Sequence, residues 1–252
     1  ASEKFKVEVD EREILVRAEL PGNNCGGCGY AGCDALAKAI VEGKAKVNQC
    51  PVGGASVGDK IAAIMGVEAG AAEKMVAFVK CKGTCDKANV QYNYYGMDDC
   101  VKIAAAVPGA GDKACSYGCL GSGSCVKACQ FDAIHIVDGV AVVDKEKCVA
   151  CGACAAVCPR HLIDLVPYKA EHLVQCNSHD KGADVKKKCD AGCIGCTLCT
   201  KQCEADAIHM DNNVAVIDYE KCTNCGKCAE KCPAQSKLKC NSMNISHGNK
   251  LT

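Results

Sequence analysis

The chain has 252 residues, 30 acidic and 30 basic residues, and no tryptophan. Its formal net charge of zero predicts no general attraction to nucleic acid or to an acidic membrane surface. No apolar run reaches the roughly 18 residues that a membrane-spanning helix needs. Cysteine is the exceptional residue, with 26 copies, and we expect the function to lie in these thiols.

The first motif follows a charged, cysteine-free segment at residues 1–18, which we interpret as a lead-in. In residues 19–55, glycines allow the tight turns that bring thiolates together. The helical stretch after Cys33 then returns the chain to Cys50. We expect a small helical module with one [4Fe-4S] cluster, held by Cys25, Cys28, Cys33 and Cys50.

The middle of the chain is less regular. Residues 56–79 are alanine-rich with apolar residues at helical spacing, which predicts a helical connector. Residues 80–113 contain three cysteines, too few for a four-cysteine site unless another segment contributes one. We expect a cluster here from Cys81, Cys85 and Cys100, with Cys176 as the fourth ligand and Cys189 as its alternative.

Residues 114–170 and 171–236 repeat one cysteine pattern at an offset of 74 residues. Each copy has the spacing of a two-cluster ferredoxin, in which the fourth cysteine of each run ligates the other cluster. Between the runs, β-branched alternation is broken by Asp138-Gly139 or by Asn212-Asn213, which predicts a hairpin. The expected fold is α+β: the helical module, two tandem two-cluster ferredoxin-like modules, and a polar tail at 237–252.

The first copy departs from the pattern, because Ser122 stands where the second copy has Cys196. We expect Cys115, four residues before Cys119, to supply the missing ligand. The expected sets are Cys115, Cys119, Cys125 with Cys158; Cys148, Cys151, Cys154 with Cys129; Cys193, Cys196, Cys199 with Cys232; and Cys222, Cys225, Cys228 with Cys203. With the other two sites, this predicts six [4Fe-4S] clusters.

Other uses of the cysteines are less consistent with their spacing. A disulfide scaffold suits the cysteine content, but runs at two-residue spacing suit a metal better. Structural zinc uses paired C-x-x-C units without a third close cysteine. Cys189, Cys193 and Cys196 match the spacing of radical S-adenosylmethionine enzymes, but they overlap a ferredoxin run, and the chain has too few strand–helix units for the barrel. No nucleotide-binding glycine loop occurs, so we expect no flavin or nicotinamide site and no catalytic residue.

The joined motifs PGNNCGGCGYAGC and KACSYGCLGSGSCVKAC, followed by the ferredoxin-type runs, resemble the RnfB family over roughly residues 5–236. Its members are polyferredoxin subunits of the Rnf complex, a membrane-bound ferredoxin:NAD oxidoreductase, and six clusters resemble the long, anaerobe-type version. The resemblance implies a translocase subunit at the cytoplasmic face of the membrane that accepts electrons from reduced ferredoxin. It would relay them to the other Rnf membrane subunits, where NAD is reduced and Na⁺ or H⁺ moves.

The resemblance also sets expectations about the membrane. The family's N-terminal hydrophobic helix has no counterpart here, and ASEKFKVEVDERE resembles the stretch that follows it. We therefore expect this chain to be soluble as given, with membrane contact through partner subunits and the missing helix. By itself it would be an electron carrier without a substrate site.

Three other functions compete with this interpretation. The nearest is an iron–sulfur subunit of another anaerobic complex, such as a hydrogenase or heterodisulfide reductase partner, although these generally lack the joined GGCGYAGC module. A corrinoid methyl-transfer protein would need a large barrel-forming remainder. An iron store or scaffold would differ in not being reducible by ferredoxin.

Overall fold

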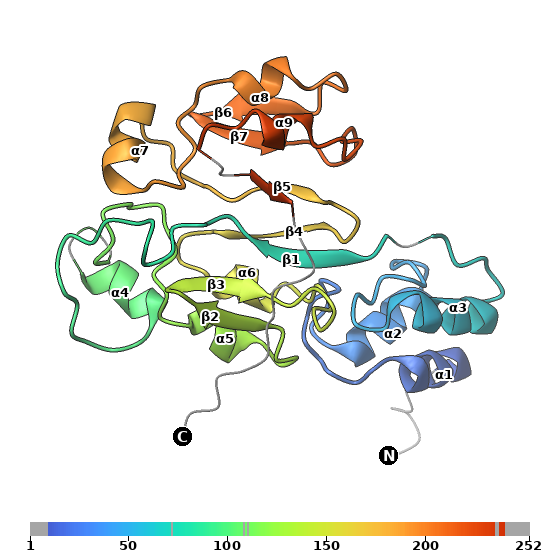
Figure 1. The fold of residues 1–252 in the computed structure, drawn as a ribbon. Coiled ribbons are helices and arrows are strands. Elements are labelled where there is room, and N and C mark those ends of the chain that lie inside the picture. Colours follow the sequence, from blue (N-terminus) through green and yellow to red (C-terminus); the bar gives the residue numbers. More distant parts are fainter. Residues whose placement is uncertain (1–9, 72, 108, 110, 235–236, 240–252) are drawn as a thin grey trace, which may run out of the picture.

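The computed structural model describes residues 10–71, 73–107, 109, 111–234 and 237–239 (Figure 1). The helices are α1 (Glu11–Glu19), α2 (Cys33–Val41), α3 (Gly54–Met65), α4 (Cys100–Ala106), α5 (Ser124–Ala128), α6 (Ala153–Val157), α7 (Gly182–Lys188), α8 (Leu198–Lys201) and α9 (Lys227–Glu230). The strands are β1 (Met75–Val79), β2 (Ile134–Val137), β3 (Val140–Val143), β4 (Ile163–Pro167), β5 (His172–Val174), β6 (Ile208–Asp211), β7 (Val214–Ile217) and β8 (Lys237–Lys239). Mixed helices and strands agree with the expected α+β class.

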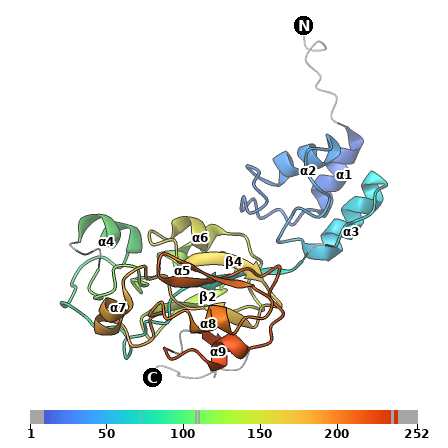
Figure 2. The same cartoon turned by 90° about the horizontal axis from the view of Figure 1, so that it is seen from above.

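Helices α1, α2 and α3 form the N-terminal module, which stands to one side of the remaining elements (Figure 2). Its core contains Val16, Leu36 and Ile61, all fully buried. The lead-in interpretation did not include helix α1, which begins where the Asp10 carboxylate accepts a hydrogen bond from the Arg12 amide at 2.9 Å. A side-chain acceptor of this kind satisfies one of the free amides at a helix start.

The helical connector predicted over residues 56–79 is wrong in its second half. Helix α3 ends at Met65, and Gly66 closes it in the left-handed conformation with φ +65°. Residues 75–79 instead form strand β1, which pairs antiparallel with β4. The MVAFV sequence suits a strand because β-branched and aromatic side chains pack well on a pleated surface.

Both predicted hairpins are confirmed. Strands β2 and β3 are joined by Asp138 and Gly139, with φ of +48° and +75°. Strands β6 and β7 are joined by Asn212 and Asn213, with φ of +43° and +70°. Two successive left-handed residues are what a two-residue type I′ turn requires, and its twist matches that of the flanking strands.

The two ferredoxin-like units have matching outer strands. The ladder of β1 with β4 accompanies the β2–β3 hairpin, and the ladder of β5 with β8 accompanies the β6–β7 hairpin. The first unit therefore extends back to β1, beyond the expected start at residue 114. Residues 80–113 become an insertion within it that carries α4: Cys81 and Cys115 are 34 positions apart, whereas Cys176 and Cys189 are 13 apart.

Candidate metal centres

Cysteine side chains gather in fours around five cavities of about 290 to 460 Å³, counting the open mouths. We number the sites by their order through the molecule. Site I holds Cys25, Cys28, Cys33 and Cys50; site II holds Cys129, Cys148, Cys151 and Cys154; site III holds Cys100, Cys119, Cys125 and Cys158; site IV holds Cys81, Cys115, Cys176 and Cys189; site V holds Cys193, Cys196, Cys199 and Cys232.

The sequence predicts a sixth group, site VI, at the positions of the second unit that correspond to site II: Cys203, Cys222, Cys225 and Cys228. Cys203 and Cys222 pack against the same core as the buried Cys228. The local contacts match as well. The Ala207 amide donates to the Cys203 sulfur at 3.2 Å, as the Ala133 amide does to Cys129 at 3.5 Å.

Short loops place the cysteines of each run. In site II, Gly152 at φ +79° ends the loop of Cys148 and Cys151, and α6 begins directly after it with Cys154 in its first turn. Gly226 at φ +80° does the same before Cys228. Residues in this left-handed conformation turn successive thiols toward one point. The local sequence therefore determines three of the four ligands of each such site. The cavities of sites I, II and V group the cysteines as the sequence predicts.

Site III differs from the expected set, because Cys100 takes the place assigned to Cys115. Cys100 begins helix α4, which Asp99 caps by accepting a hydrogen bond from the Val101 amide at 2.9 Å. The Cys100 amide donates to the buried Ser124 hydroxyl at 2.8 Å, which anchors α4 to the first unit. The absence of a cysteine at Ser122 signals a missing ligand, but no spacing in the sequence points to Cys100.

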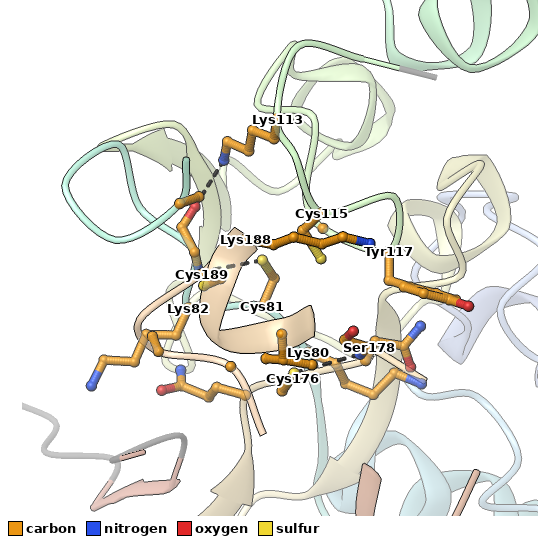
Figure 3. A pocket seen from close by; sticks show the side chains of 18 residues that line it. Lys80, Cys81, Lys82, Lys113, Cys115, Tyr117, Cys176, Ser178, Lys188 and Cys189 are labelled. Atoms are coloured by element: carbon orange, nitrogen blue, oxygen red, sulfur yellow. Dashed lines mark hydrogen bonds between the residues drawn. The ribbon is translucent and has the colours of Figure 1, made fainter. Parts of the chain in front are cut away.

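Site IV also differs from the expected grouping of Cys81 and Cys85 with Cys100 (Figure 3). Here both candidates for the fourth ligand, Cys176 and Cys189, face Cys81, and Cys115 completes the set. Cys85 is exposed and lies outside this cavity, with its amide hydrogen-bonded to the Asp138 carbonyl at 2.9 Å. Cys240 lies outside the described residues.

Site IV is built from equivalent positions of the two units. The Cys81 sulfur accepts hydrogen bonds from the amides of Gly83 and Cys119, each at 3.4 Å. In the second unit, the Cys176 sulfur accepts from the amides of Ser178, at 3.5 Å, and Cys193. Cys119 and Cys193 are separated by the 74-residue repeat, as are Cys115 and Cys189. Each unit therefore contributes one cysteine that follows an outer strand and one that precedes its ferredoxin run.

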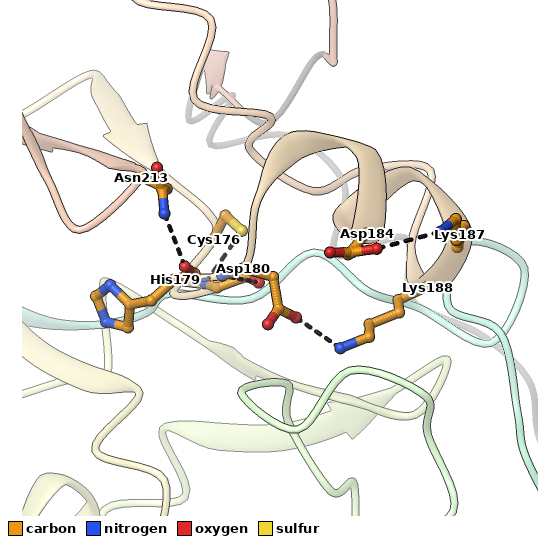
Figure 4. A network of polar contacts seen from close by, with 8 residues as sticks. Cys176, His179, Asp180, Asp184, Lys187, Lys188 and Asn213 are labelled. Carbon is orange, nitrogen blue, oxygen red and sulfur yellow. Dashed lines mark hydrogen bonds and ion pairs between the residues drawn. The ribbon is translucent and has the colours of Figure 1, made fainter.

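A polar network holds the Cys176 segment against the second unit (Figure 4). The Asn213 side chain donates to the His179 carbonyl at 3.0 Å, and the His179 ring contacts the Asn212 carbonyl at 3.1 Å. The Asp180 carboxylate pairs with Lys188, on helix α7, at 2.8 Å. These contacts fix the loop between β5 and α7, and with it the place of Cys176 and Cys189 in site IV.

The donor chemistry fits iron–sulfur clusters. Burial raises the pKa of the Cys125 thiol to about 12 and that of Cys154 to about 11, with neighbouring thiolates adding to the effect. Such groups become thiolates only when bound cations compensate the charge, as metal ligation does. No described cysteine is disulfide-bonded.

The spacing of the thiols argues against a single metal ion. A tetrahedral zinc site with Zn–S bonds of about 2.3 Å needs sulfurs about 4 Å apart. Among the described residues, no three His, Cys, Asp or Glu side chains are grouped closely enough to hold one ion. Four thiols around a cavity fit a larger, cube-shaped group, so the residues present fit [4Fe-4S] clusters.

The sites follow one another through the molecule. Site I meets site II where Gly27 lies against the backbone of Cys151. Sites II and III share one hydrophobic core, and site III meets site IV through the bond from the Cys119 amide to Cys81. Site IV meets site V through the bond from the Cys193 amide to Cys176, and sites V and VI share the second core. We call this succession the row.

Three family models match parts of the chain. Residues 20–52 match "Putative Fe-S cluster", residues 141–164 match "4Fe-4S binding domain" and residues 192–236 match "4Fe-4S dicluster domain". They cover the cysteines of sites I, V and VI, three cysteines of site II, and Cys158 of site III. Together with the four-cysteine cavities, these matches define the chain as a multi-site iron–sulfur protein with ferredoxin-type units.

Relatives identify the family more closely. The chain is 49% identical to the RnfB subunit of the Na⁺-translocating ferredoxin:NAD⁺ oxidoreductase complex of Acetobacterium woodii, over 98% of the chain and 73% of that protein. It is 46% identical to the corresponding subunit of the ion-translocating oxidoreductase complex of Methanosarcina acetivorans, over 94% of the chain and 89% of that protein. It is 42% identical to the corresponding subunit of the proton-translocating ferredoxin:NAD⁺ oxidoreductase complex of Clostridium ljungdahlii, over 92% of the chain and 82% of that protein. The chain belongs to this family, the RnfB subunits of the Rnf complexes.

Family membership also bears on the membrane. No helix in the described ranges is both long enough and apolar enough to cross a bilayer. The relatives are subunits of ion-translocating complexes.

Proposed function

We propose that this chain relays electrons through six [4Fe-4S] clusters, held by sites I to VI, within an ion-translocating ferredoxin:NAD oxidoreductase. Family membership supports the electron-transfer role and the place in a multi-subunit Rnf complex. The observation that supports the relay is the row itself: five cavities are each lined by four cysteines, the repeat supplies a sixth set, and neighbouring sites share backbone contacts or a core. When bound, the clusters supply one-electron chemistry with little rearrangement of the protein.

The chain's own residues would hold the clusters and set their potentials. Its cysteines hold each site on short loops and helix starts, and backbone amides donate to the sulfurs. Hydrogen bonds to sulfur and exposure to solvent are the main means by which a protein sets a cluster's potential. The row avoids long gaps because neighbouring sites share cores or direct backbone contacts.

Reduced ferredoxin is the proposed electron donor, at the cytoplasmic face of the membrane. In the second unit, Cys196 of site V and Cys225 of site VI are exposed. An exposed ligand allows a partner protein to approach a cluster edge closely. The other Rnf subunits are the proposed acceptors, and NAD reduction belongs to them, because hydride formation needs a flavin and a nicotinamide pocket.

The test uses the isolated chain, purified without oxygen. Stopped-flow mixing with a reduced low-potential ferredoxin should bleach the cluster absorbance, while NAD⁺ added to the same mixture should yield no NADH. Iron analysis should give about 24 atoms per chain, from six four-iron clusters. A value of about 20 iron atoms would mean that one of the six sites holds no cluster, and a value of about 8 would exclude the six-cluster assignment. Robust NADH formation by the isolated chain would contradict the relay.

A further inference from the structure

Site IV has a different electrostatic environment from the other cavities. Four half-buried lysines line it: Lys80, Lys82, Lys113 and Lys188. No lysine or arginine lines the cavities of sites I, II and V, and the cavity of site III has only Arg160. Among these five cavities, the cations are therefore concentrated around the one that joins the two ferredoxin-like units.

The four lysines are not equivalent. Lys80 pairs with Asp164 and Lys188 with Asp180, each at 2.8 Å, so their charges are largely neutralised. The Lys82 ammonium points away from the sulfurs (Figure 3). Lys113 makes no ion pair with any described residue, and its ammonium donates to two carbonyls instead.

Those two carbonyls belong to the wall of the site. The Lys113 ammonium donates to Gly83 O at 2.9 Å and to Gly139 O at 2.8 Å. Gly83 lies against two ligands: a Cβ built on it would be 3.5 Å from the Cys189 sulfur and 3.6 Å from the Cys81 sulfur. The Gly83 amide is also the donor to Cys81. Lys113 thus holds the segment that aims this amide at the sulfur, and it places in the wall of the site a positive charge that no described carboxylate pairs with.

We propose that Lys113 is a positioning residue that raises the reduction potential of a [4Fe-4S] cluster in site IV, and that site IV has the highest potential in the row. The inference rests on the proposed function. Taking up one electron from a neighbouring site adds one negative charge and requires no proton. A fixed cation and amide donors to sulfur both favour the more negative state.

Burial acts in the opposite direction, because a less polar surrounding disfavours added charge. It does not single out site IV. Of its four cysteines only Cys81 is buried, whereas three of the four in site III are buried. The lysines remain the feature that distinguishes site IV, and its central place in the row makes it the point where an electron from either unit would be held.

The experiment is a redox titration of the full chain, followed by electron paramagnetic resonance. The signal that appears first as the potential is lowered should be lost or altered in Cys189→Ser, which assigns this signal to site IV. Cys176→Ser is the second variant if Cys189→Ser misfolds. Lys113→Gln should shift the reduced-to-oxidised ratio of that signal about tenfold toward oxidised, a midpoint about 59 mV lower for one electron. Lys113→Arg, which keeps the charge, should have a midpoint potential close to that of the wild type.

The matched control is Lys60→Gln, which removes the same charge from the N-terminal module, where Lys60 pairs with Glu19. It should leave the earliest signal unchanged. An unchanged midpoint in Lys113→Gln, or an earliest signal unaffected in both cysteine variants, would overturn the proposal. Iron content separates this outcome from failure of the relay: a wild-type chain lacking iron contradicts the proposed function, whereas full iron with an unshifted midpoint contradicts only the role of Lys113.

Discussion

The N-terminal module and the first ferredoxin-like unit approach each other closely at Gly27. A Cβ built on Gly27 would lie 2.7 Å from the carbonyl oxygen of Cys151 and 2.8 Å from its Cα. Ordinary contact begins at 3.4 Å, so Gly27→Ala must move one backbone away from the other by about 0.7 Å. Both partners are main chain, so no side-chain rotation relieves the overlap.

The expected result of Gly27→Ala is a weakened junction between sites I and II with every site still assembled. Overpacking of this kind costs about 1 to 3 kcal/mol if the modules stay together. If they separate instead, the electron path to site I lengthens. We therefore expect unchanged iron content but slower appearance of the site I signal in freeze-quench electron paramagnetic resonance after mixing with reductant.

The matched control is Gly70→Ala, where the nearest atom is the flexible Asn48 side-chain nitrogen at 3.9 Å. In this variant, a cluster in site I should be reduced at the wild-type rate. If Gly27→Ala also keeps both the wild-type rate and the wild-type thermal stability, the backbone contact with Cys151 is not the junction, and the order of sites I and II in the row is wrong.

Three further substitutions test the grouping of cysteines and the turn beside them. Cys100→Ala should remove one cluster, about four iron atoms per chain, while Cys85→Ala should retain all of them; iron loss in Cys85→Ala would contradict the assignment of site III or site IV. Gly139→Ala should lower the free energy of unfolding by about 1 kcal/mol or more, because φ is +75° and the new Cβ would lie 2.7 Å from the Cys85 sulfur. Chemical denaturation measures this loss, and the double variant with Cys85→Ala should recover only the part due to the overlap.

Much of the local architecture follows from the sequence alone. The ferredoxin runs set three ligands of each cluster within a few residues, and the hairpins follow from Asp138-Gly139 and Asn212-Asn213 between β-branched segments. The glycine-rich motif predicts the grouping of site I. In each case the contacts join residues close in sequence, or repeat a spacing written twice.

The structure decided what depends on contacts between distant segments. The MVAFV sequence of strand β1 suits a strand, but the segment follows a helical stretch, and its place is decided by pairing with β4, about 90 positions later. Helix α1 has a capping residue in Asp10 but no cysteine, and it is stable because Val16 packs in the core of the N-terminal module. Tertiary packing overrides the local pattern at both places.

The same distinction separates the cysteines that the sequence grouped from those that it did not. Spacing determines that Cys193, Cys196 and Cys199 act together, because only a few residues separate them and the loop has little freedom. Nothing in the spacing says that Cys81 and Cys115 meet Cys176 and Cys189, or that Cys100 completes site III. Those sets form only when the two units pack together and the insertion docks through Ser124. The sequence by itself determined the chemistry and the repeated sites, whereas the tertiary structure decided which thiols share the sites at the joints, because only packing brings such distant segments within reach of one another.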